Sequence, residues 1–177
     1  MANTRRHQRF GSALAAGAIA ITANTLALKA ADLIPLATAK GGLLRLIAPW
    51  VSPLLDATGA AAGWRAVGAP APNTPLFQTA FHVAVGIAMA LFYVYALEPL
   101  LRGPAWIKGT IYAVAVWIMN AALVLPATGE GLAGSAHLTV AGIVWFAAAH
   151  TVFFVTMAVL FEQFTGAKQR SRVLVEG

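Results

Sequence analysis

The chain has 177 residues, of which 59% are hydrophobic and only 10% are charged. Soluble proteins carry roughly 25% charged residues, and a soluble domain of this length could not bury so much apolar surface. The composition therefore excludes a soluble protein and predicts one all-α membrane domain over residues 1–177, with lipid covering its apolar faces. The absence of cysteine excludes disulfides and thiolate metal sites.

Four apolar segments are long enough to cross a bilayer as helices. They span about residues 10–36, 76–97, 105–125 and 137–161. The first resembles a secretory signal, but the internal repeat described below favours an uncleaved span. The fourth is longer than a span requires, so either it tilts strongly or residues near 132–142 form a separate outer segment.

The connection over residues 40–75 is the longest loop, and we expect it to lie outside the cytoplasm. Its apolar residues recur at helical spacing between Leu43 and Leu55, with charged residues interspersed. This pattern predicts one or two short interfacial helices, broken at Pro49 and Pro53. Trp50 is expected at the level of the lipid headgroups.

Basic residues set the expected orientation. The N-terminus, the turn between the second and third spans, and the C-terminal tail all contain several Lys or Arg residues. Such regions face the cytoplasm, so we expect an up-down-up-down bundle with both termini cytoplasmic. The net charge of +6 is explained by this topology and by anionic lipid, without a nucleic-acid partner.

A weak internal repeat relates the two halves of the chain. The stretch Ile34–Leu43, IPLATAKGGL, resembles Leu125–Leu132, LPATGEGL. Each stretch is followed by a histidine that precedes a Met-Ala pair by seven residues, at His82 and at His150. The pattern predicts two tandem helical hairpins inserted the same way up.

The repeat places His82 and His150 at equivalent depths in two parallel helices that can lie diagonally across the bundle. One interpretation is that they are the two axial ligands of a haem b. Gly86 and Gly142 would leave room for the macrocycle. The alternative is that each histidine only caps or cross-links helices through hydrogen bonds.

A metal site is a third interpretation, with Asp32 joining His82 and His150. Two imidazoles and a carboxylate suit zinc, copper or iron, although the three residues lack any local ligand spacing. Asp32 can instead form an ion pair with Lys29 or Arg45.

Asn24 and Asn120 fall near the middle of the first and third spans. Asparagines at this depth hold helices together, and the absence of an ionisable group there argues against a transport path. The aromatic-rich helix faces can contact lipid or a cofactor, and lipid is the default expectation; they contain Trp106, Tyr112, Trp117, Trp145, Phe146, Phe153 and Phe154.

The turn EPLLRGPAWIKGT and the segment AVAVWIMNAALVLPATGEG resemble the YagU-like kind of uncharacterised small four-helix bacterial inner-membrane proteins. The resemblance covers about residues 76–161. It implies a multi-pass protein of the bacterial inner membrane. It carries over no activity and no catalytic residue.

The function predicted from these features is that of a non-catalytic accessory or anchoring subunit of a membrane complex. Its expected partners are the lipid bilayer and other membrane subunits or further copies of the chain. One alternative is a redox or metal-binding subunit that uses His82 and His150. Another is a small transporter or channel.

Overall fold

The computed structural model describes residues 2–34, 36–39 and 41–176, and side chains only between residues 6 and 166 of these ranges. Within them the chain is helical and contains no strand. The long helices are α1 (Ala2–Leu33), α4 (Pro75–Phe92), α5 (Ala105–Met119) and α7 (Val140–Glu176).

Four helical stretches are long and apolar enough to cross a membrane, as predicted. They are Arg6–Leu33, Pro75–Leu97, Ala105–Ala127 and Val140–Gly166. The last stretch begins only at Val140, after a short 3₁₀ turn η3 (Leu132–Gly134). The long fourth apolar segment is thus a connecting turn followed by a span, which was the second of the two alternatives.

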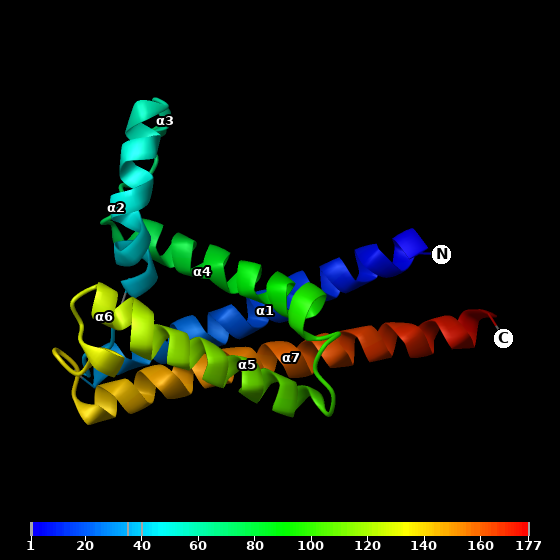
Figure 1. The fold of residues 1–177 in the computed structure, drawn as a ribbon. Helices are drawn as coiled ribbons and strands as arrows, with labels where there is room; N and C mark the ends of the chain where they lie inside the picture. Colours follow the sequence, from blue (N-terminus) through cyan, green and yellow to red (C-terminus); the bar gives the residue numbers. More distant parts are fainter. Residues whose placement is uncertain (1, 35, 40, 177) are drawn as a thin grey trace.

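Helices α1 and α7 run antiparallel along each other; α4 packs on α1, and α5 packs on α7 (Figure 1). Successive spans alternate in direction, so this is an up-down-up-down arrangement. Both termini lie at one end of the bundle, here called the termini end, and the opposite end is the loop end. Which side of a membrane the termini end faces stays a prediction.

Two spans finish in π-helical turns. The segment η1 (Tyr93–Leu97) continues α4, and η2 (Asn120–Val124) continues α5 into the short α6 (Leu125–Ala127). Single π turns inside helices occur frequently at functional sites. Only η2 lies at the loop end of the bundle (Figure 1).

The long loop contains α2 (Gly42–Ala57) and α3 (Ala60–Ala66), which project together from the loop end at a steep angle to the spans (Figure 1). The expected breaks at Pro49 and Pro53 are wrong, because α2 continues through both. The prolines are four residues apart and both exposed, so they share one outward face. Water or headgroups can satisfy the carbonyl groups that each proline leaves without a donor.

The termini end holds a dense aromatic core. Tyr93 stacks on Tyr112 with ring centroids 6.1 Å apart, and Tyr112 meets Phe154 at 4.4 Å. All three side chains are at most 6% exposed. The expectation that Tyr112 and Phe154 face lipid is therefore wrong: protein covers them.

Ion pairs lie beside this core. Glu98 accepts hydrogen bonds from Arg9 at 2.8 Å and from Lys108 at 3.3 Å, joining α1 to the turn before α5 and to α5 itself. Glu162 accepts from the backbone N–H of Ala105 at 3.1 Å, at the first residue of α5. A carboxylate at a helix N-terminus satisfies a free donor and suits the helix dipole.

Candidate functional site

The site is positioned by close contact between α1 and α4. A Cβ added at Gly17 would lie 2.7 Å from the Cβ of Ala90, and one added at Gly86 would lie 2.5 Å from the Ile21 side chain. Small residues of this kind let two helix backbones approach closely. The same face of α1 continues from Ile21 to Asn24 and brings its amide against α4.

This packing removes the room expected for a haem. The Ile21 side chain fills the space beside Gly86, and Gly142 lies against the backbone carbonyl of Ala37. Neither glycine leaves a slot for a macrocycle. The two positions expected to accommodate a haem are therefore packed against other parts of the protein.

Asn24 is the centre of a hydrogen-bond chain and is only 1% exposed. Its Nδ2 donates to the carbonyl oxygen of Ala149 in α7 at 2.8 Å. Its Oδ1 lies 2.8 Å from Nε2 of His82 in α4. A single amide thus joins α1 to α4 and to α7, and holds the His82 ring in a fixed orientation.

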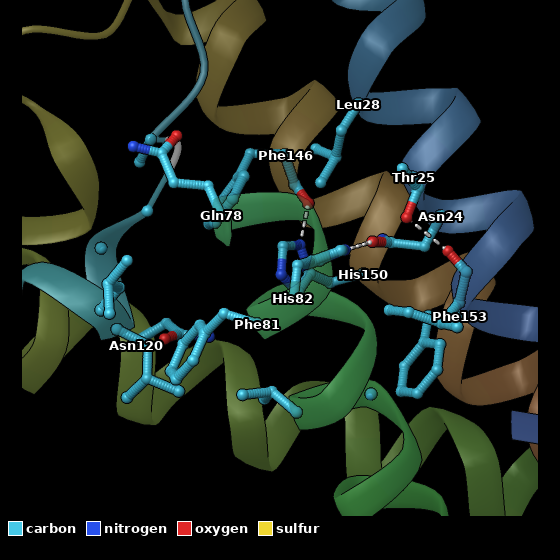
Figure 2. Close-up of a pocket in the computed structure, with 18 of the residues that line it drawn as sticks. Asn24, Thr25, Leu28, Gln78, Phe81, His82, Asn120, Phe146, His150 and Phe153 are labelled. Atoms are coloured by element: carbon cyan, nitrogen blue, oxygen red, sulfur yellow. Dashed lines mark hydrogen bonds between the residues drawn. The ribbon is translucent and has the colours of Figure 1, made fainter. Parts of the chain in front are cut away.

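His150 lies on α7, and its side chain lines the same cavity as that of His82 (Figure 2). Its Nδ1 donates to the carbonyl oxygen of Phe146, one turn earlier, at 2.7 Å. The Phe146 ring packs against the imidazole with centroids 4.3 Å apart. His150 therefore bonds within its own helix, whereas His82 links two helices.

A cavity of about 460 Å³ lies at the loop end and is lined by all four spans and by the first residues of α2 (Figure 2). All five site residues predicted from the sequence line this one cavity: Asn24, Asp32, His82, Asn120 and His150. Most of the remaining lining is apolar and includes Val85, Met89, Met119, Phe146 and Phe153.

Two amides in this lining have free hydrogen-bonding capacity. The side-chain amides of Asn120, at the start of the π turn η2, and of Gln78 in α4 make no hydrogen bond to any other described residue. Gln78 was not predicted as a site residue. It lies four residues before His82 and so shares its helix face, a spacing that was visible in the sequence.

The three-ligand metal site is not assembled. No group of three or more His, Cys, Asp or Glu side chains within the described ranges is placed to hold a metal ion. Asp32 lines the cavity eight residues beyond Asn24, which is about 12 Å along an α-helix. The Asp32 carboxylate therefore lies at a different level of the bundle from His82, which is bonded to Asn24.

An ionic cluster lies outside the spans at the loop end. Glu130 accepts from Arg45 of α2 and lies 3.1 Å from Nδ1 of His137. The hydrogen bond from Arg45 holds the pKa of the Glu130 carboxyl below its ordinary value. Arg45, expected as a partner of Asp32, thus pairs with Glu130 and ties the base of α2 to the loop after α6.

Comparisons with protein families, with curated proteins and with solved structures found no match for this chain. The resemblance to YagU-like proteins stays a prediction. The chemistry of the site indicates what it can do: mainly apolar walls, two imidazoles and two unpaired side-chain amides converge on one cavity. This combination is typical of small-molecule binding sites.

Proposed function

We propose that this protein is a multi-pass membrane protein that binds a small, mainly apolar molecule in the cavity at the loop end. The observation that carries the proposal is the convergence of His82, His150 and Asn120 on one cavity of about 460 Å³. Binding cavities for small ligands measure about 300–1,000 Å³ and place a few polar groups among apolar walls.

The unpaired polar groups favour binding over a purely structural role. Asn24 alone would join α1 to α7, and its bond to Ala149 does not involve either histidine. The Asn120 amide and one nitrogen of each imidazole remain without a partner among the described residues. An unpaired polar group in an apolar environment costs free energy, and a ligand with matching groups recovers it.

The predicted role as an accessory or anchoring subunit is compatible with such a site and stays a prediction. The arm formed by α2 and α3 supports it, since Trp50 is 81% exposed and Leu54 is 63% exposed there. Lipid or another subunit would cover these side chains in a membrane. The redox or metal-binding alternative and the transporter alternative likewise stay predictions.

Photo-crosslinking tests the binding proposal. The protein, reconstituted in lipid nanodiscs, is irradiated with a diazirine derivative of para-hexylphenol, and the labelled residues are mapped by mass spectrometry. We expect labels on cavity-lining residues such as Val85, Phe146 and Phe153. Labels confined to the exposed span residues Val83 and Val144 would show that the probe only dissolves in the lipid, and would contradict the proposal.

A further inference from the structure

The hydrogen bonds around Asn24 fix which nitrogen of His82 carries its proton. The backbone carbonyl of Ala149 can only accept, so the Asn24 amide must direct its NH₂ group there and its oxygen toward His82. Nε2 of His82 must then donate. In the neutral ring, Nδ1 is left as a hydrogen-bond acceptor.

His150 also keeps one ring nitrogen as a hydrogen-bond acceptor, but a different hydrogen bond fixes the position of its proton. Its Nδ1 lies 2.7 Å from the carbonyl oxygen of Phe146, which again can only accept, so Nδ1 carries the proton. Nε2 of His150 is left with a lone pair. Both neutral imidazoles of the cavity are therefore acceptors toward a ligand, and neither has a ring N–H left to offer.

The lining also selects the charge of the ligand. Among the described residues, the only carboxylate that lines the cavity is Asp32, at the far end of α1 beside Lys29. A cation bound between the histidines would find apolar walls and no close counter-charge, at a large desolvation cost. A neutral hydroxyl group donates one hydrogen bond and carries no such cost.

From these constraints we infer that the cavity selects ligands whose neutral hydroxyl group donates a hydrogen bond to His82 or His150, as an alkylated phenol or hydroquinone does. This inference rests on the proposed function and narrows it to a chemical class. A molecule of the same shape that carries only acceptors, such as an aryl ether or a quinone, leaves both imidazole lone pairs unpaired.

The test compares two probes that differ only in the donor. Equilibrium binding of radiolabelled para-hexylphenol and of its methyl ether, para-hexylanisole, is measured on the full chain in nanodiscs, with empty nanodiscs as background. One neutral hydrogen bond contributes a few-fold to an affinity, so we expect the phenol to bind about fivefold more tightly than the ether.

In the variant His150→Phe the ratio of phenol affinity to ether affinity should fall. Equal or tighter binding of the ether by the unaltered protein would overturn the inference and leave the cavity a binding site. Binding of neither probe would overturn the proposed function as well. If His150→Phe does not fold, the two probes on the unaltered protein still decide the question.

Discussion

The two ends of the bundle are built from the same kinds of helix but are packed differently. At the termini end, Gly109 lets α5 approach α7 so closely that a Cβ there would lie 2.7 Å from the carbonyl oxygen of Phe154. Aromatic rings fill the remaining space, and Arg9, Glu98 and Lys108 form ion pairs beside them. At the loop end the same four spans surround a cavity of about 460 Å³.

The contrast assigns different roles to the two ends. Close packing and ion pairs at the termini end hold the four spans together, because lipid offers no hydrophobic driving force for helix association. The loop end then does not need a filled core. It can keep a cavity whose polar groups have incomplete hydrogen bonds, as proteins do at functional sites.

The largest expected effect comes from filling the close contact at the termini end. Gly109→Leu forces a side chain against the backbone of Phe154 and Val155, and we expect it to cost about 3 kcal/mol of stability. Unfolding in mixed micelles, followed by circular dichroism, measures the change.

The matched control is Gly11→Leu, where no atom lies within 4 Å of the added Cβ. Both variants gain up to about 1 kcal/mol of helix propensity, so only the packing differs. Equal stability of the two variants would show that the termini end is not closely packed.

A smaller effect separates the two asparagines of the cavity. Asn24→Leu removes hydrogen bonds to Ala149 and His82 and should cost about 1–2 kcal/mol. Asn120→Leu removes no hydrogen bond to another described residue and should leave stability within about 0.5 kcal/mol. The same unfolding assay compares them, and a greater loss for Asn120→Leu would reverse the assignment.

The smallest effect concerns the ionic cluster at the loop end. Because the pKa of Glu130 is lowered in the folded protein, its contribution to stability is present above the ordinary value of 4.5 and is lost as the pH falls through the folded pKa. For a pair with a half-exposed arginine we expect about 0.5 kcal/mol.

Glu130→Gln removes the ionisable group and should flatten the dependence of stability on pH below about 4.5. Stability curves recorded from pH 7 to pH 3 in the same micelles provide the comparison. If the variant and the unaltered protein lose stability in parallel, other carboxyl groups determine the acid sensitivity.

The four spans could be predicted because their length and apolarity follow directly from the thickness of a bilayer. The polar site residues could also be singled out, since Asn24, His82 and His150 are rare groups within apolar segments. The hydrogen bond between Asn24 and His82 could not be predicted. Asn24 and His82 are 58 positions apart, and their bond depends on how closely α1 approaches α4 at Gly17 and Gly86.

The buried aromatic residues show a second limit of prediction. Tyr112 and Phe154 are apolar enough for either lipid or protein to cover them, so composition alone does not separate the two environments. The path of α2 through Pro49 and Pro53 was missed for a related reason. An exposed helix face tolerates free carbonyl groups when a polar medium lies against it.

Binding of radiolabelled para-hexylphenol to two variants of α4 tests the central claim most directly. Val85 lines the cavity, whereas Val83 is 37% exposed and does not line it. We predict that Val85→Phe, which fills the cavity, lowers the affinity at least tenfold, and that Val83→Phe binds as the unaltered protein does. Equal binding by both variants would contradict the claim that the loop end holds a ligand site.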